Sequence, residues 1–458
     1  MATSYSDNRD SSYSLDAGFI ESILESVENG DQRKLSELLE QLHRADIADL
    51  LEQIGPEERA RLIELWGEEF EPGVLPELND NITEEIVESL PADRLSNAVR
   101  DLESDQVVDL VEDLEPDRQE EVLDTLDDVR RASVEKLLNY PDESAGRVMQ
   151  TEVVMLPVHW NVGEAIDHLR SRSGLPDGFY HVMLIDSRIR PTGQVALGKL
   201  MSSRREVELK SIAEEDFATF SVDQCQEDVA YAFKQYRLIS APVVDEAGRL
   251  MGAVTIDDAV NVLDEHAKED MHLLAGVGDE SLSDRIIDVA KQRFPWLVAN
   301  LATAVLASIV IAQFSATIEA VVALAVLMPI VASMGGNAGT QSLTVAVRAI
   351  ATKDLTNSNA WRVIRRESVV GLINGLVFSA IIGGIGLIWY GSAALSAVLA
   401  AAVVVTMLMA GISGILIPIL LERAKVDPAL ASSTFVTTVT DIVGFLAFLG
   451  LGYMVFLT

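Results

Sequence analysis

The sequence predicts a multidomain membrane protein, and three observations support this fold class. The 458 residues suffice for several domains. Residues 284–458 carry eight acidic and ten basic side chains, which leaves 63 of the 71 acidic and 25 of the 35 basic side chains to residues 1–283. Apolar segments of membrane-spanning length lie only in the second part. We expect an all-α acidic helical N-terminal domain, a tandem of α/β domains, a connecting helix and a five-helix transmembrane domain.

Short amphipathic helices are expected over residues 15–140, after a polar, Ser-rich tail of residues 1–14 that we expect to be disordered. The segments IGPEER, LPADR and LEPDR each place a proline near a helix start, with acidic residues in the first turn. The excess of acidic residues in this half disfavours binding to nucleic acid. It is consistent with attraction of cations and, as an alternative, with a surface adapted to high salt.

An internal repeat occupies residues 141–203 and 204–262. Each copy has the predicted order strand, helix, strand, strand, helix. Asp186 in the first copy corresponds to Asp245 in the second copy, and VALGKLM corresponds to GAVTIDD. The repeat resembles a tandem of cystathionine-beta-synthase (CBS) domains, which pair into a regulatory module.

The GAVTIDD segment is similar to the nucleotide-ribose motif of CBS domains, with Thr255 and Asp258 at the marked positions. The resemblance implies a nucleotide site, with ATP as a candidate ligand. The motif is weak on spacing alone, and the first copy departs from it.

A connecting helix is expected over residues 263–284, where the sequence around LDEHAKEDMH is crowded with acidic side chains. A solvated acidic helix is one interpretation. The alternative is that divalent cations bridge this helix to other acidic surfaces, because like charges repel unless a cation lies between them.

Five apolar spans are predicted within the transmembrane domain, residues 285–458. Lys and Arg residues flank every second connection, which places the N-terminal domains in the cytoplasm and the C-terminus outside the cell. The predicted spans are Phe294 to Ala312, about Ala320 to Val347, Val369 to Tyr390, Ala393 to Leu421 and Ala429 to Leu457.

The second span contains PIVASMGGNAGTQ, where small and polar residues replace the usual Leu and Ile. Such residues allow close helix approach or a break in the helix, and a break is tolerated where it lines a water-filled cavity. We favour a pore lining over a packing seam. The candidate pore-lining residues are Pro329, Gly335, Gly336, Gly339 and Gln341.

Asp441 lies in the otherwise uncharged fifth span, and the spans contain no His or Cys. A carboxylate at membrane depth is costly unless it serves an ion pathway or has a partner. With Asn337 and Thr438 it forms a set of hard oxygen ligands suited to Mg²⁺ or Ca²⁺. The alternative is an acid that is protonated or bonded to a neighbouring helix.

Nearly the whole chain resembles the MgtE family of magnesium channels, most specifically in PIVASMGGNAGTQ, VDPALASS and TTVTDIVG. The resemblance implies a homodimer with its pore between the protomers and hydrated Mg²⁺ at Asp441. It also implies that cytosolic Mg²⁺ bridges acidic domains and closes the pore. The regulatory metal residues carried over by motif are Asp258, Glu265, Glu269, Asp270 and Asp427.

The expected function is therefore a Mg²⁺-selective channel for magnesium uptake across the cell membrane. A cation transporter coupled to H⁺ or Na⁺ could use the same buried acid, and a non-conducting divalent-cation sensor could use the same acidic domains. An enzyme is not expected, because no arrangement of nucleophile, base and oxyanion donors is evident. Membrane entry of a divalent cation at −100 mV is favourable by about 4.6 kcal/mol, so no ATP-driven step is needed.

Overall fold

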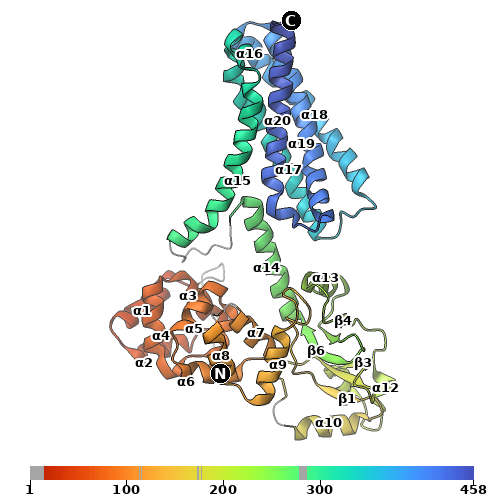
Figure 1. The fold of residues 1–458 in the computed structure, drawn as a ribbon. Helices are drawn as coiled ribbons and strands as arrows, with labels where there is room; N and C mark the ends of the chain where they lie inside the picture. The colour runs from red at the N-terminus through yellow and green to blue at the C-terminus, as the bar shows by residue number, and fades with distance from the viewer. Residues whose placement is uncertain (1–14, 113, 115, 173–174, 177, 278–285) are drawn as a thin grey trace. The chain divides into compact units, whose positions relative to one another are not determined.

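The computed structural model describes residues 15–112, 114, 116–172, 175–176, 178–277 and 286–458 (Figure 1). The chain forms two compact units. The first comprises Met1–Glu265 and Ser281–Ser283, and the second comprises His266–Glu280 and Asp284–Thr458. The tail expected over residues 1–14 lies outside the described residues.

The described residues of the N-terminal region form helices joined by short turns, as predicted. Its helices are short because turns with Pro, Gly or Asp interrupt the amphipathic pattern every ten residues or so. Their apolar faces form one core that continues into the second α/β copy. The elements are α1 (Ala17–Glu28), α2 (Gln32–Leu39), α3 (Arg44–Gln53), α4 (Pro56–Trp66), η1 (Gly67–Glu69), η2 (Pro72–Glu77), α5 (Asp80–Ser89), α6 (Ala92–Asp101), α7 (Ser104–Glu112), α8 (Pro116–Leu123) and α9 (Asp128–Leu138).

Arginine side chains, rather than glycine caps, bind the last carbonyls at two helix ends in this region. The last carbonyls of a helix lack partners within it, and cations are favourable there. Arg59 on α4 donates from Nε to the carbonyl of Leu51 (2.9 Å) and from Nη2 to that of Ile54 (3.1 Å), at the end of α3. Arg118 donates to the carbonyls of Val87 (2.8 Å) and Leu90 (2.7 Å), at the end of α5. Arginines thus join α4 to α3 and α8 to α5.

Replacing Arg59 with methionine should destabilise the N-terminal helices. The side chain is 1% exposed, and its Nη1 also pairs with Glu85 Oε2 at 2.5 Å. Removing it leaves two buried carbonyls and one carboxylate without their donor, which should cost about 3 kcal/mol of unfolding free energy. Thermal unfolding of the purified chain in detergent measures the loss. Arg61→Met, on the exposed face of the same helix, should change little, and equal effects of the two changes would contradict the capping role.

Two three-stranded sheets, with strand orders β1-β2-β3 and β4-β5-β6, follow the helices and confirm the predicted repeat. In each sheet the first pair of strands is parallel and the second pair is antiparallel. The elements are β1 (Met155–Pro157), α10 (Val162–Ser171), β2 (His181–Ile185), β3 (Pro191–Ala196), α11 (Leu197–Ser202), α12 (Leu209–Ile212), β4 (Phe220–Ser221), α13 (Gln226–Tyr236), β5 (Ser240–Val244), β6 (Leu250–Thr255) and α14 (Ile256–Ala275).

The two copies share their turn chemistry. Asp186 Oδ1 accepts hydrogen bonds from the amides of Arg188 and Arg190, and Asp245 Oδ1 accepts from the amides of Ala247 and Arg249. An Asp that binds amides two and four residues ahead closes a tight turn between strands. The aspartates that correspond in sequence therefore correspond in structure.

Helix α14 begins earlier than the expected connecting helix. The expected segment starts at residue 263, but α14 runs without interruption from Ile256 to Ala275. The last helix of the second α/β copy and the connecting helix are therefore one helix. Residues 278–285, at the end of the expected segment, lie outside the described residues.

The second unit contains the five predicted apolar helices, each long enough to cross a membrane. Several of these helices begin before or end beyond the limits of the predicted spans. The third helix starts nine residues before Val369, the predicted start of the third span, and so includes Glu367. A short helix, α16, joins the first two. Helices α17 to α20 pack beside one another in the bundle (Figure 1). The bounds are α15 (Ile286–Ala312), α16 (Ser315–Ala320), α17 (Ala323–Ala351), α18 (Ala360–Tyr390), α19 (Ala393–Arg423) and α20 (Pro428–Phe456).

Candidate functional site

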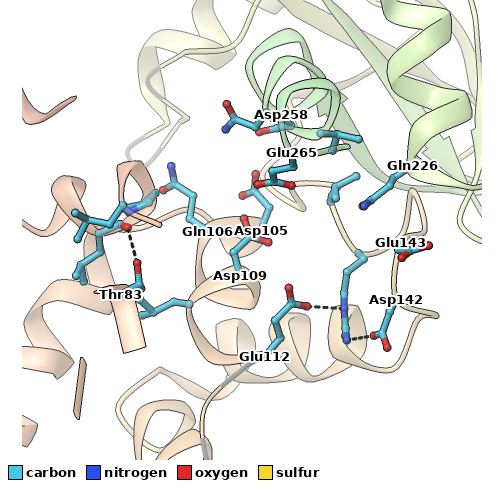
Figure 2. Close-up of a pocket in the computed structure, with 18 residues that line it drawn as sticks. Thr83, Asp105, Gln106, Asp109, Glu112, Asp142, Glu143, Gln226, Asp258 and Glu265 are labelled. Atoms are coloured by element: carbon cyan, nitrogen blue, oxygen red, sulfur yellow. Dashed lines mark hydrogen bonds and ion pairs between the residues drawn. The ribbon is translucent and has the colours of Figure 1, made fainter. Parts of the chain in front are cut away.

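An acidic cavity of about 440 Å³ lies in the first unit, between the N-terminal helices and the second α/β copy (Figure 2). Figure 2 shows Asp105 and Asp109 of α7 on one side and Asp258 and Glu265 of α14 on the other. Its charged lining consists of seven acidic side chains and one basic side chain, Arg147. The other acidic members of this lining are Glu112, Asp142 and Glu143.

Asp105 is the most buried acid of the cavity, with 5% of its surface exposed. It is fixed in place because Ser104, the first residue of α7, donates to Glu152 Oε2 (2.8 Å) and accepts from the amide of Thr151 (2.9 Å). Burial raises the pKa of the Asp105 carboxyl well above its usual range, and the charge of Asp258 raises it further. Within the described residues, Asp105 Oδ1 is buried without a hydrogen-bond partner. A cation would supply the missing partner.

Asp258 has a structural role as well. Its Oδ2 accepts hydrogen bonds from the amide (3.0 Å) and the hydroxyl (2.5 Å) of Thr255, and this caps the start of α14. Burial raises the pKa of the Asp258 carboxyl despite these two hydrogen bonds. The two residues of the predicted nucleotide motif are thus bonded to each other, and the Asp258 carboxyl faces the acidic cavity.

Arg147 neutralises only part of the cavity. It forms ion pairs with Glu112 (Nε to Oε2, 3.0 Å) and with Asp142. No three acidic, His or Cys side chains among the described residues converge closely enough to hold a bare ion. A wide cavity lined by separated carboxylates is suited to a hydrated ion, and Mg²⁺ keeps much of its hydration shell in proteins.

The structure brings together only two of the predicted regulatory residues. Asp258 and Glu265 line the cavity, whereas Glu269 and Asp270 lie further along α14 and are not part of its lining. Asp427 caps α20, with Oδ1 accepting from the amide of Ala429 (2.7 Å).

Acids on α7 complete the cavity, although sequence reasoning did not identify them. Asp105, Asp109 and Glu112 recur at i, i+4 and i+7, a spacing that places them on one face of the helix. All three line the cavity, and Asp105 is the buried member. The i, i+4, i+7 spacing is the feature of the sequence that could have identified these acids as members of one site.

In the second unit, Gly335 and Gly339 lie in a packing seam between helices. From the sequence, a pore lining was favoured for these two glycines, and a packing seam was the alternative. A Cβ on Gly335 would lie 2.4 Å from Thr406 Cγ2, and a Cβ on Gly339 would lie 2.6 Å from Val436 Cγ1. Helix α17 continues through this segment without a break. The glycines therefore permit close approach of α17 to α19 and α20.

Substituting alanine for Gly335 should strongly impair folding and transport. The added methyl group would overlap Thr406, which is fully buried, so one of the helices must move. The neighbouring Gly336 provides a matched control, because nothing lies within 4 Å of a Cβ built there. Gly336→Ala should leave the thermal midpoint unchanged or raise it slightly. Thermal unfolding and flux assays compare the two variants, and similar behaviour would contradict the seam.

The opposite face of α17 carries exposed polar side chains in two adjacent i, i+4 series. Asn337 Nδ2 donates to Ser333 Oγ (3.4 Å) on this face. A polar face on a membrane-spanning helix requires a protein partner or water, since lipid satisfies no hydrogen bonds. We call this face the polar row of α17, and it consists of Ser333, Asn337, Thr340, Gln341 and Thr344. Of the predicted pore residues Pro329 is also exposed, and Gly336 is half-buried.

Asp441 lies at the same level of the bundle as Asn337. Gly335 contacts Thr440, so the segments that contain Asn337 and Asp441 lie against each other. Asp441 is half-buried, and within the described residues its carboxylate makes no hydrogen bond or ion pair. Thr438 donates its hydroxyl to the carbonyl of Thr434 (2.6 Å), which leaves the oxygen lone pairs available as acceptors.

Comparison with known protein families assigns both units. Residues 328–451 match the MgtE family, described as divalent cation transporters; residues 42–143 match the MgtE intracellular N domain; residues 209–265 match the CBS domain. A solved structure, the cytosolic domain of the Mg²⁺ channel MgtE in complex with ATP, is similar with a TM-score of 0.50 and 30% identity. The match covers 53% of this chain and 99% of that chain.

Two relatives match more than two thirds of the chain. The magnesium transporter MgtE of Bacillus subtilis is 33% identical over 320 residues, and that of Thermus thermophilus is 34% identical over 325 residues. Each match covers 70% of this chain and 71% of the relative. The protein is a multi-pass membrane protein with an intracellular N-terminal domain, and it is a transporter rather than an enzyme. The chain belongs to the MgtE family of magnesium transporters.

Proposed function

We propose that this transporter is a Mg²⁺-selective channel for uptake across the cell membrane, closed by cytosolic Mg²⁺. The observation that carries the proposal is Asp441, a carboxylate in an uncharged helix, without a protein partner in the described chain. It lies level with the polar row of α17. A single acid among neutral oxygens favours a largely hydrated divalent cation. Asp441, with Asn337 and Thr438, would hold the permeating Mg²⁺.

The permeation path is proposed to lie between two protomers. The packed face of α17 contains Gly335 and Gly339, so the polar row points away from the bundle of its own protomer. One acid per chain is few for a divalent ion, and a homodimer would supply two. The polar row, with Gln341 and Asn337 at its centre, would line the path. The C-terminus would lie outside the cell.

Closure is proposed to result from Mg²⁺ binding in the acidic cavity. Seven acidic side chains against one arginine give the cavity lining a net negative charge, so α7 and α14 repel when the cavity is empty, and a bound divalent cation would draw the two helices together. Asp105, Asp258 and Glu265 are the proposed regulatory residues of the cavity. Glu269, Asp270 and Asp427 remain proposed regulatory residues on the evidence of the sequence motif alone.

ATP binding to the CBS pair is a further part of the proposal. It is supported by the similar cytosolic domain of a Mg²⁺ channel that was solved with ATP, and by the motif residues Thr255 and Asp258 at the start of α14. The nucleotide would act as a regulator and would not be consumed, because the chain has no Walker A motif.

Flux measurements in proteoliposomes test the proposal. Mg²⁺ influx should follow the membrane potential, persist without an H⁺ or Na⁺ gradient and fall when Mg²⁺ is raised on the cytoplasmic side. Influx that requires either gradient would instead support a coupled transporter. Absence of flux from correctly folded protein would support a non-conducting sensor.

A further inference from the structure

A second acid, Glu367, lies inside the membrane bundle. It is on α18, seven residues after the helix start, which is about 10 Å along the axis. Only 12% of its side chain is exposed. An acid buried among membrane helices is expensive, so its retention points to a specific role.

The contacts of Glu367 join three helices. Its Oε2 accepts a hydrogen bond at 3.2 Å from the hydroxyl of Ser342 on α17, a residue with 9% of its surface exposed. Its backbone carbonyl lies against α19, where a Cβ on Gly411 would approach it to 2.6 Å. One turn further along α19, a Cβ on Gly414 would lie 2.7 Å from Ser342 Cβ. Two glycines of α19 thus let α17 and α18 come close enough for the carboxylate to reach Ser342.

The remaining oxygen of Glu367 has a weaker partner. Arg366 Nε lies 3.9 Å from Oε1, and the Arg366 side chain is 76% exposed. A solvated guanidinium at this distance gives little stabilisation. The hydrogen bond to Ser342 is therefore the principal polar interaction of the carboxylate.

Ser342 is well placed to control the rotation of α17. It lies on the packed face, one turn beyond Gly339, while Asn337, Gln341 and Thr344 lie on the exposed face. A hydrogen bond from one face of a helix resists rotation about the helix axis more than close-packed glycines do, because glycines offer no directional contact. Rotation of α17 would turn the whole polar row.

We propose that Glu367 is a positioning residue: through Ser342 it sets the rotation of α17 and so aims the polar row at the permeation path. This inference rests on the proposed function, in which the polar row lines that path. The carboxylate itself does not contact the permeating ion. Its role requires a hydrogen-bond acceptor of this length, so glutamine should replace it and leucine should not.

Cysteine accessibility in proteoliposomes tests the role directly. The only native cysteine, Cys225, is replaced by serine, and single cysteines are introduced at Ser333, Asn337, Gln341 and Thr344. Reaction with a water-soluble methanethiosulfonate reports which positions face water. Leu343→Cys, at a site with 1% exposure, serves as the unreactive control.

We expect Ser342→Ala and Glu367→Leu to change the reaction rates at the polar row by about two- to thirtyfold, in the same pattern. The double variant should match either single variant, and Glu367→Gln should retain the original pattern. The Mg²⁺ concentration for half-maximal flux should shift with the rates. A purely structural role would lower the amount of folded protein and leave the pattern of reactive positions unchanged.

The experiment distinguishes failure of the positioning role from failure of the proposed permeation path. If the polar row reacts in the starting protein and neither Ser342→Ala nor Glu367→Leu alters the pattern, the positioning role is wrong and the path stands. If the introduced cysteines do not react even in the starting protein, the polar row does not face water. That result overturns the proposed path, and the role of Glu367 falls with it. Ser342→Ala removes only one hydroxyl, so the test does not depend on the folding of Glu367→Leu.

Discussion

Replacing Asp441 with asparagine should reduce Mg²⁺ influx by more than tenfold without unfolding the bundle. A divalent cation about 5 Å from a carboxylate gains about 1.7 kcal/mol even at the dielectric constant of water, which corresponds to more than a tenfold change in occupancy. The gain is larger in a narrow path. Within the described residues Asp441 makes no hydrogen bond or ion pair, so asparagine should not disrupt packing.

The measurement is initial Mg²⁺ influx in proteoliposomes at a fixed negative potential, with thermal unfolding of each variant in detergent. Glu319→Gln is the matched control, because Glu319 is an exposed acid on α16 in the same unit. Its flux should stay within about twofold of the starting protein, since exposed charges are screened by salt. Equal flux through Asp441→Asn and the starting protein would remove Asp441 from the permeation path.

The second span illustrates how far sequence reasoning reached. Its composition correctly indicated an unusual helix, but composition could not separate the face that packs from the face that is exposed. Gly335 and Gly339 turn inward because Thr406 and Val436 occupy the space where their side chains would be. Asn337 and Gln341 lie on the other face. Which face packs depends on helices far away in the chain.

Sequence reasoning did not identify Glu367 as an acid within the third span, for a related reason. Apolar composition placed the start of the span at Val369, after Glu367, because charged residues normally mark the end of a span. In the structure α18 starts at Ala360, and the glycines of α19 enclose Glu367 within the bundle. A single-sequence hydropathy pattern cannot reveal such shielding, since it depends on tertiary contacts.

Replacing Asp105 with asparagine should raise stability and weaken regulation together. Burial and the charge of Asp258 raise the pKa of the Asp105 carboxyl. The folded chain therefore binds this proton more tightly than the unfolded chain, and the group stabilises the fold only when protonated. As pH rises from the unfolded pKa through the raised folded pKa, stability is lost. Asparagine removes that loss at neutral pH.

The thermal midpoint of Asp105→Asn in EDTA should therefore exceed that of the starting protein by a few degrees at pH 7.5, since about 1 kcal/mol corresponds to roughly 2–4 °C. The difference in midpoint between the variant and the starting protein should shrink toward zero as pH falls below about 4. There the Asp105 carboxyl becomes protonated in the folded and in the unfolded chain. Added Mg²⁺ should stabilise the starting protein more than the variant, because binding to the folded state raises its midpoint. Scanning fluorimetry across pH, with and without Mg²⁺, measures both effects.

In flux assays, Asp105→Asn and Asp258→Asn should each raise the cytoplasmic Mg²⁺ concentration for half-inhibition by about tenfold or more. This is the loss of Mg²⁺ affinity expected when one carboxylate close to the divalent ion is removed. Asp258→Asn keeps an oxygen that can accept the two hydrogen bonds from Thr255, so the cap on α14 should survive this change. Glu64→Gln, an exposed acid on α4, separates regulation from salt adaptation. If Glu64→Gln matches Asp105→Asn in the thermal unfolding and flux assays, acidity acts as a general surface property. If only the cavity variants change the response to Mg²⁺, the acidic cavity senses Mg²⁺.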